Sequence, residues 1–329
     1  PDLMASGRVT AQALGEQLYD SLRQKLMPLP DETLVYPAHG AGSMCGKKLS
    51  SETVSTLGQQ RWENYALQPM TKEAFVQMVT ADQPEAPAYF GYDAQKNRES
   101  HRTLEEVIES SLIPLSLETV LKHQQQGAQI LDVRKSVDYA GGHLKGSVNI
   151  GLVGKFATWA GTLLSPKHPI IIIAEPGKEQ EAIQRLGRIG FDRAIGYLEG
   201  GMQSVARRPD VLRKGQRISA QSLAELLTTS NPPILLDVRT EKEWTAGHID
   251  RSLNIPLSHL AENIHQLPAG KPVVVHCASG YRSSAAMGIL ERAGRTEDMD
   301  LVGGYDAWLT TWGNPRHHPS VKPAATCAN

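Results

Sequence analysis

The chain has 329 residues, of which 40% are hydrophobic and only 5% aromatic, and this composition is typical of an ordinary soluble protein of two or three domains. Lysine plus arginine (34) balances aspartate plus glutamate (35), which argues against an extended nucleic-acid surface, and no apolar run approaches membrane-spanning length. Three cysteines are too few for a disulfide framework, so a reducing cytoplasm is the expected location.

The first third, residues 1–113, combines a helical pattern with a strand and a glycine-rich loop. Leucines at helical spacing predict a helix over residues 11–26, and residues 33–36 are predicted to form a buried strand. His39 follows that strand and is a candidate metal ligand, although a lone histidine is more often structural. Cys45 is a candidate second thiol or an ordinary cysteine. Because the chain opens in mid-pattern at Pro1, we expect a fragment of a longer protein.

The remainder of the chain is an internal duplication. Three separated segments recur in the same order: 130–134 as 235–239, 142–150 as 247–255, and 198–202 as 301–305. Each copy alternates short apolar strands with helical stretches, which predicts two α/β domains, each a parallel sheet with helices on both faces. We place them at 114–208 and 217–313, with a polar linker between them and a tail at 314–329.

A cysteine stands where an apolar strand gives way to a helix in the second copy. Residues 273–275 predict a buried strand, and a helical pattern restarts at Ser283. Free backbone N–H groups of the loop can converge on Cys277 and favour its thiolate form, and Arg282 adds a fixed positive charge. The other loop residues that we expect to bind the anion are Ala278, Ser279, Gly280, Tyr281 and Ser283. The alternative is an ordinary buried cysteine at a strand end.

Several polar residues near this loop are expected to be structural. Asp237, Arg239, Glu243 and His248 should pair with one another or satisfy loop backbone groups. His276 precedes Cys277 directly, and neighbours on a strand point to opposite faces. We therefore do not assign His276 as a catalytic base.

The corresponding loop of the first copy lacks the nucleophile. Aligning the two copies places Ala174 opposite Cys277 and Glu179 opposite Arg282, and Pro176 removes one donor N–H. A carboxylate in place of the cation would repel an anion. We predict an inactive domain with a scaffolding or docking role.

The second copy resembles the rhodanese family along nearly its whole length. The resemblance lies in residues 235–239, 243–249, the Cys277 loop and residues 303–308. It implies that Cys277 takes up sulfane sulfur as a persulfide and passes it from donors such as thiosulfate or persulfides to sulfite or thiols.

The first third resembles the carboxyl-terminal part of a metallo-β-lactamase-fold domain, through residues 2–3, 19–22, 29–31 and 35–40. The complete arrangement is similar to bacterial persulfide dioxygenase–sulfurtransferase fusions of sulfide detoxification. Iron or zinc is expected only in the complete metallo-β-lactamase-fold domain, because the histidine-rich ligand motif of that family is absent from this sequence. The rhodanese copies need no cofactor, and His39 matches only the last ligand position.

Two other classes of function stay open. Phosphatases and arsenate reductases also place a cysteine and an arginine on one anion-binding loop, although they generally have one more residue between the two. A non-catalytic docking module is the other alternative, which the first copy alone would fit. The sequence predicts neither nucleic acid nor membrane as a partner, and it leaves a homo-oligomer open.

Overall fold

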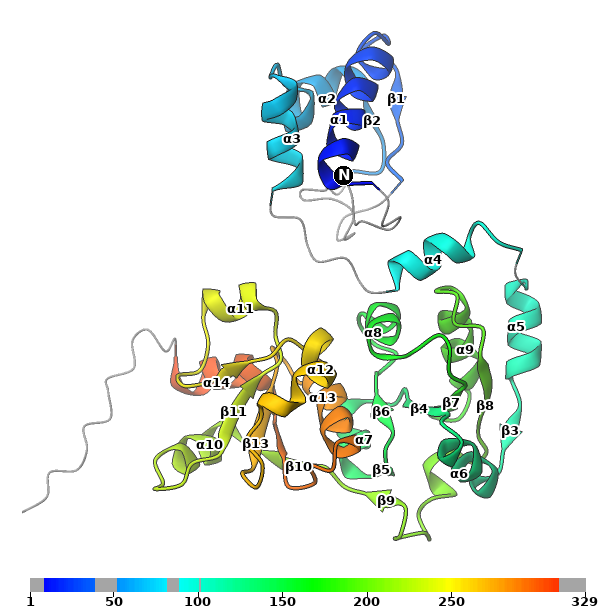
Figure 1. Ribbon diagram of the computed structural model, residues 1–329, viewed down its shortest axis with the longest axis vertical. Helices are drawn as coiled ribbons and strands as arrows, with labels where there is room; N and C mark the ends of the chain where they lie inside the picture. Colours follow the sequence, from blue (N-terminus) through cyan, green and yellow to red (C-terminus); the bar gives the residue numbers. More distant parts are fainter. Residues whose placement is uncertain (1–8, 39–51, 82–88, 101, 314–329) are drawn as a thin grey trace, which may run out of the picture. The chain divides into compact units, whose positions relative to one another are not determined.

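The computed structural model describes residues 9–38, 52–81, 89–100 and 102–313, and the chain divides into two units, residues 1–101 and 102–329 (Figure 1). In the described part of the chain, no helix is long and apolar enough to cross a membrane. We describe each unit by itself.

Helices dominate the N-terminal unit. The predicted helix is confirmed as α1 (Ala11–Ser21), which continues as a π-helical segment, Leu22–Leu26. It packs against α3 (Lys72–Thr80), where the rings of Tyr19 and Phe75 meet edge to face. The other elements of this unit are α2 (Leu57–Glu63), a 3-10 turn (Tyr65–Leu67), α4 (Phe90–Lys96), β1 (Leu34–Val35) and β2 (Ser55–Thr56).

The prediction at residues 33–36 is right about a strand, which covers Leu34–Val35, but wrong about its burial. Strand β1 is two residues long and, among the described residues, pairs with β2 alone, and the side chains of Leu34 and Tyr36 are 57% and 69% exposed. A two-stranded ribbon of this length buries little apolar surface by itself, and the side chains of Leu34 and Tyr36 stay in contact with solvent. His39 and Cys45, which follow this strand in the sequence, lie outside the described residues.

The first α/β domain is built on a parallel five-stranded sheet in the order β3-β8-β7-β4-β6. Its strands are β3 (Pro114–Leu115), β4 (Gln129–Asp132), β6 (Val148–Asn149), β7 (Ile170–Ile173) and β8 (Ala194–Leu198). Its helices are α6 (Leu117–Gln125), α7 (Ser136–Gly141), α8 (Phe156–Leu163) and α9 (Glu179–Gly187), followed by a 3-10 turn (Gly201–Gln203). Helix α5 (Leu104–Ser111) precedes them and packs on α9.

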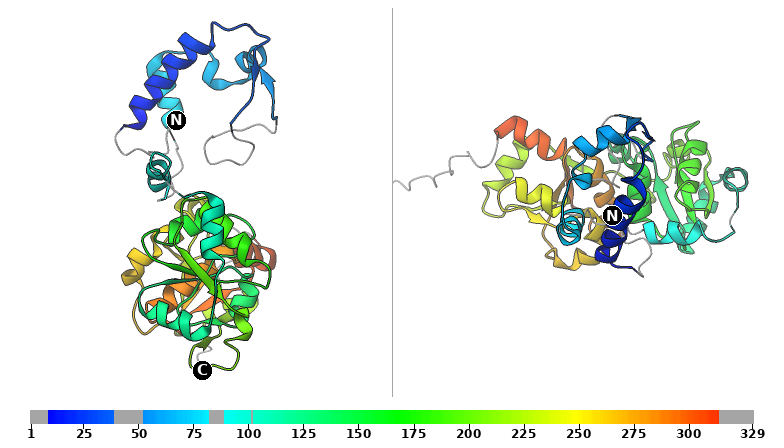
Figure 2. Two further views of the ribbon diagram at one scale, coloured as in Figure 1. Left: turned by 90° about the vertical axis from the view of Figure 1, so that its right-hand side faces the viewer. Right: turned by 90° about the horizontal axis from the view of Figure 1, so that it is seen from above.

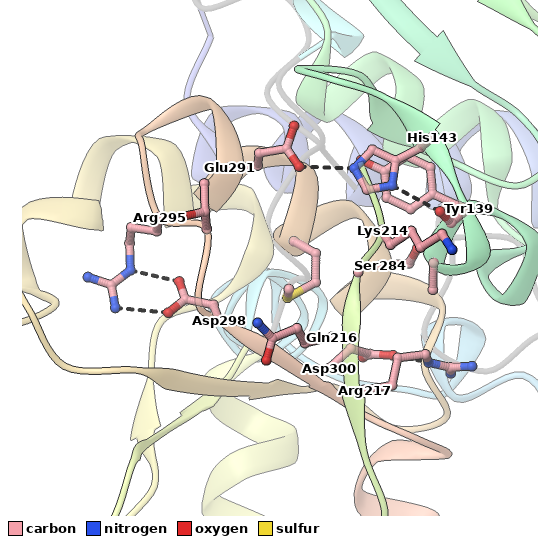
Figure 3. A pocket seen from close by; sticks show the side chains of 14 residues that line it. Tyr139, His143, Lys214, Gln216, Arg217, Ser284, Glu291, Arg295, Asp298 and Asp300 are labelled. Atoms are coloured by element: carbon pink, nitrogen blue, oxygen red, sulfur yellow. Dashed lines mark hydrogen bonds and ion pairs between the residues drawn. The ribbon is translucent and has the colours of Figure 1, made fainter. Parts of the chain in front are cut away.

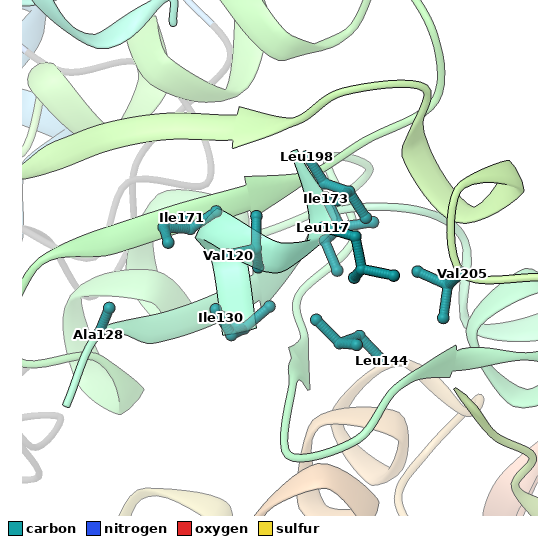
Figure 4. Packing of buried hydrophobic residues seen from close by; sticks show 9 residues of the cluster. All are labelled: Leu117, Val120, Ala128, Ile130, Leu144, Ile171, Ile173, Leu198 and Val205. Carbon is teal, nitrogen blue, oxygen red and sulfur yellow. The ribbon is translucent and has the colours of Figure 1, made fainter. Parts of the chain in front are cut away.

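Helices cover both faces of this sheet, as predicted. Leu117 and Val120 of α6 pack on Ile171 and Ile173 in one core cluster (Figure 4). Ile170 and Ile172 alternate with these residues and face the other side, where α9 contacts β7. The ribbon shows helices on both sides of the sheet (Figure 2). All four isoleucines of β7 are fully buried, which suits the central strand of a two-sided sheet.

The second α/β domain repeats this architecture in the order β10-β14-β13-β11-β12, again with all strands parallel. The strands are β10 (Gln216–Ile218), β11 (Ile234–Asp237), β12 (Leu253–Asn254), β13 (Val273–His276) and β14 (Met299–Leu301). The helices are α10 (Ala220–Leu227), α11 (Glu241–Ala246), α12 (Leu260–Asn263), α13 (Tyr281–Arg292) and α14 (Gly304–Trp312), with 3-10 turns at Leu257–His259 and Ile264–Gln266.

The duplication extends to individual hydrogen bonds. Arg134 forms a bidentate pair with Asp132 and also donates to the carbonyl oxygen of Gly142. Arg239 does the same with Asp237 and Gly247 in the second copy. The two domains are therefore copies of one structure.

The segment between the domains is more ordered than a polar linker would be. It contains β9 (Leu212–Arg213), which pairs antiparallel with β5 (His143–Leu144) of the first domain. The N–H group of Gly215 also donates to the carbonyl oxygen of Ala140. These hydrogen bonds attach the connection to the first domain along its length. The predicted tail, 314–329, lies outside the described residues.

Candidate active site

Cys277 lies at the carboxyl end of β13, in the middle of the second sheet, directly before α13. Helix α13 begins at Tyr281, two residues before the predicted start. The thiol is only 1% exposed, and the backbone N–H of Gly280 donates to its sulfur at 3.2 Å. Gly280 has a φ of 104°, a conformation that favours glycine. The predicted placement of Cys277 between strand and helix is thus confirmed.

The far side of the loop is held by the start of α14. The N–H groups of Tyr305 and Asp306 donate to the carbonyl oxygens of Cys277 and Ala278 at 2.8 and 2.9 Å. This approach requires Gly304, because a Cβ atom there would overlap the same two carbonyl oxygens. Sequence reasoning assigned no site role to Gly304, although the Gly-Gly pair at 303–304 carries the signal.

The sequence suggested that Arg282 would be a free cation on the loop, but in the structure it is paired with a carboxylate. Its two terminal nitrogens each donate to one carboxylate oxygen of Glu243 at 2.7 Å. Burial acts against the charge of Arg282, but the Glu243 carboxylate and the nearby Cys277 raise the pKa of its guanidinium. Glu243 therefore links α11 to the Cys277 loop, a contact that no local sequence pattern reveals.

Glu243 has a second role, because it completes the capping box of α11, whose N-cap residue is Thr240. It accepts hydrogen bonds from the N–H and hydroxyl groups of Thr240. Although burial opposes ionisation, the hydrogen bonds from Arg282 and Thr240 lower the pKa of Glu243 from 4.5 to about 2. Its expected structural role is confirmed, and its main partner is Arg282.

Replacing this carboxylate should change how stability depends on pH. A depressed folded-state pKa stabilises the fold above the unfolded pKa, and that stabilisation is lost as pH falls from 4.5 towards 2. We expect Glu243→Gln to be less stable than the wild type at pH 7, with a difference that narrows at pH 3, in urea unfolding. Glu241→Gln, at an exposed position of the same helix turn, is the control. A constant difference between Glu243→Gln and wild type would contradict the assignment.

Several polar side chains are buried close to the Cys277 loop. Asp237 and Arg239 pair with each other, and the Arg239 guanidinium lies 4.0 Å above the ring of Tyr305. His276 is fully buried, 3.8 Å from Asp237, and its Nε2 atom makes no hydrogen bond to the described residues. Burial lowers the pKa of His276, which makes its ring a weaker proton acceptor than an exposed histidine, and its exclusion as a catalytic base stays our prediction. His248, also expected to be structural, stacks on Trp244.

The first copy keeps the loop geometry without the thiol. Ala174 is buried at the end of β7, and Gly177 has a φ of 84°, at the position that matches Gly280. Helix α9 then begins at Glu179. The loop offers no sulfur and carries a carboxylate at the Arg282 position, so inactivity of this copy stays our prediction.

Helix α13 connects the Cys277 loop to the first domain (Figure 1). The Tyr281 hydroxyl donates to the carbonyl oxygen of Gly151, and the Ser284 hydroxyl donates to Asn149 Oδ1, both at 2.7 Å. Burial raises the pKa of Tyr281, which keeps its hydroxyl a donor. The loop residue Tyr281 is thus tied to the first domain, whereas Ala278 is half-buried and Ser279 is exposed.

The far end of α13 makes a second set of contacts with the first domain. Glu291 accepts from the N–H of Gly146 at 2.7 Å and lies 3.0 Å from Nε2 of His143, whose other ring nitrogen contacts the carbonyl oxygen of Tyr139. Figure 3 shows these groups on the wall of a pocket formed by both domains. Sequence reasoning did not predict these contacts.

A metal centre is not supported by the described residues. Among them, no group of three or more histidine, cysteine, aspartate or glutamate side chains could hold a metal ion. The proposed ligand His39 and the second thiol Cys45 both lie outside these residues. The described residues therefore do not form a site for iron or zinc.

The family model for the rhodanese-like domain matches residues 116–208 and 219–311, more than half of the chain. The chain belongs to the rhodanese-like family. A sulfurtransferase from Allochromatium vinosum is 32% identical over 91 residues, covering 28% of this chain and 85% of that protein. The probable adenylyltransferase/sulfurtransferase MoeZ of Mycobacterium tuberculosis is 34% identical over 97 residues, covering 29% of this chain. The match spans 25% of MoeZ.

A crystal structure of a metallo-β-lactamase from Staphylococcus aureus is similar to 60% of this chain and 55% of its own, with a TM-score of 0.50 and 27% identity. The chain is thus an α/β protein with two rhodanese-like domains preceded by a metallo-β-lactamase-like region, as predicted. These relationships support a sulfurtransferase function.

Proposed function

We propose that the second rhodanese-like domain transfers sulfane sulfur through a persulfide on Cys277. The observation that carries this proposal is the hydrogen bond from the backbone N–H of Gly280 to the Cys277 sulfur, 3.2 Å long, at the end of β13. The relationship to the A. vinosum sulfurtransferase supports the same chemistry.

The reaction has two displacement steps. The Cys277 thiolate attacks the outer sulfur of the donor, a new S–S bond forms, and the donor leaves as sulfite from thiosulfate or as a thiolate from a persulfide. Sulfite, cyanide or a thiol then attacks the outer sulfur and releases the Cys277 thiolate. The Gly280 N–H and the positive charge of Arg282, held by Glu243, stabilise the negative charge on sulfur in both steps.

The wider role that we propose is in sulfide detoxification, within a persulfide dioxygenase–sulfurtransferase fusion. A complete metallo-β-lactamase-fold domain would supply iron-dependent oxidation of a persulfide to sulfite, and the rhodanese thiolate would move sulfur between persulfide, sulfite and thiol pools. The metallo-β-lactamase-like region supports this order of domains. No step of the Cys277 reaction depends on the metal.

Phosphatase or arsenate chemistry is the alternative that the loop composition left open. An oxyanion site of that kind uses a cation aimed at the bound oxygens. Here both terminal nitrogens of Arg282 are bonded to Glu243, and four residues separate Arg282 from Cys277. The arrangement favours an anion with a single sulfur atom.

Intact-mass spectrometry of the full chain tests the proposal. Incubation with thiosulfate or glutathione persulfide should add one sulfur atom, and cyanide should remove it, because the outer sulfur of a persulfide is open to nucleophilic attack. The phosphoester and arsenate substrates serve as the comparison. No sulfur gain with either donor, together with turnover of a phosphoester or arsenate, would replace sulfur transfer by the alternative.

A further inference from the structure

Asp300 is a buried carboxylate near the Cys277 loop, on the strand next to β13. It lies on β14 and is 5% exposed, and its Oδ1 atom accepts a hydrogen bond from the Ser283 hydroxyl at 2.6 Å. The Ser283 oxygen in turn lies 3.8 Å from the Cys277 sulfur. Sulfur, hydroxyl and carboxylate thus form one line of hydrogen bonds, from the loop to the pocket of Figure 3.

The single hydroxyl hydrogen of Ser283 couples the protonation of Cys277 to that of Asp300. A serine hydroxyl has one hydrogen, and an ionised carboxylate only accepts. While Asp300 is ionised, the hydrogen of Ser283 is held by Asp300, so the hydroxyl presents lone pairs to Cys277 and suits a thiol that donates. With Asp300 protonated, the order reverses, and Ser283 donates to a thiolate.

We propose that Asp300 is a positioning residue that accepts the Cys277 thiol proton through Ser283. The S–H bond of Cys277 breaks as its proton passes to the Ser283 oxygen, while the hydroxyl proton of Ser283 passes to Asp300. The negative charge moves from carboxylate to sulfur, and nothing is oxidised or reduced. The proposal rests on Cys277 being the nucleophile of the proposed function.

The surroundings of Asp300 suit a proton acceptor. Burial raises the pKa of Asp300, against the opposing effects of Ser283 and Arg217. Arg217 faces the carboxylate from β10, with its Nε atom 3.2 Å from Oδ2, and β13 presents the apolar Val275 at the paired position. The other charged or titratable groups lining the same pocket are Tyr139, His143, Lys214, Arg217, Glu291, Arg295 and Asp298.

Most of these neighbours already have partners. Arg295 pairs with Asp298, and Glu291 with His143. On the sulfur side, the nearby cation is Arg282, which Glu243 neutralises in part. Proton exchange along the line from Cys277 to Asp300 therefore does not involve these pairs.

The test is the pH dependence of iodoacetamide alkylation at Cys277 in the full chain, followed by peptide mass mapping. Two interacting groups release their protons in two macroscopic steps, so the wild-type rate should rise in two steps. Asp300→Asn should lose one step, because an amide cannot take up the proton. Ser283→Ala, which keeps the carboxylate and changes one buried atom, should lose it too.

Ser284→Ala is the matched control, since its hydroxyl bonds to Asn149 and not to the sulfur, and it should keep both steps. A wild-type profile with a single ionisation, or two steps that persist in Asp300→Asn and Ser283→Ala, would overturn the proposal. The assay needs no sulfur donor. A failure of sulfur uptake with both steps present therefore counts against the proposed function alone.

Discussion

Cys277→Ser should abolish sulfur transfer from thiosulfate to cyanide, with a loss of at least about a thousandfold in kcat/KM. A serine hydroxyl is not ionised near neutral pH and does not form a transferable persulfide. The Gly280 N–H and the Arg282–Glu243 pair would remain, so the loss of kcat/KM would measure the contribution of the sulfur atom alone. A thiocyanate assay on the purified full chain measures it.

Two further cysteines in the sequence provide the controls for that result. Cys45→Ser and Cys327→Ser should keep transfer to cyanide, since neither belongs to the Cys277 loop. Transfer that survives in Cys277→Ser would contradict Cys277 as the sole sulfur carrier, and adding Cys45→Ser or Cys327→Ser to that variant would identify the second one.

The second large effect concerns Gly288, where α13 crosses the first domain. A Cβ atom there would lie 2.6 Å from the carbonyl oxygen of Ser147 and 3.0 Å from the Cα of Val148. Gly288→Ala should therefore destabilise the fold by about 1–3 kcal/mol, the usual cost of overpacking, despite the better helix propensity of alanine. Because α13 carries the residues that follow Cys277, its displacement should also lower sulfur transfer severalfold.

Gly141→Ala gives the same substitution without the clash. Gly141 lies in α7, and a Cβ atom there would meet nothing within 4 Å, so this variant should be about 0.5–1 kcal/mol more stable. Urea unfolding of both variants separates packing from propensity. Equal stability of Gly288→Ala and wild type would show that the two domains do not depend on close packing at α13.

Short-range patterns in the sequence predicted the domain architecture well. The duplicated segments predicted two α/β domains with parallel sheets, and the apolar run at 273–275 placed Cys277 between a strand and a helix. The alternation of strand side chains also separated His276 from the nucleophile. Each of these features depends on neighbours in the sequence or on comparison of one copy with the other.

The missed features join residues that are distant in sequence. Nothing local marks Glu243 as the partner of Arg282, or Asp300 as the partner of Ser283. The contacts of α13 with the first domain join residues that are even more distant in sequence, as in the hydrogen bond from Ser284 to Asn149. The prediction that strand β1 is buried failed for another reason. An apolar pattern leads to burial only where another layer of the fold covers the strand.

The pairing of His143 with Glu291 shows how the two copies have divided their tasks. The equivalent histidine of the second copy, His248, stays within its own domain and stacks on Trp244. A duplicated position has thus become a tether in the copy that lacks a thiol. Mutational tolerance should therefore be distributed unevenly over that copy. Its exposed loop at 175–178 should tolerate substitutions. The segment at 146–151 should tolerate few, because it contacts α13, the helix that follows Cys277.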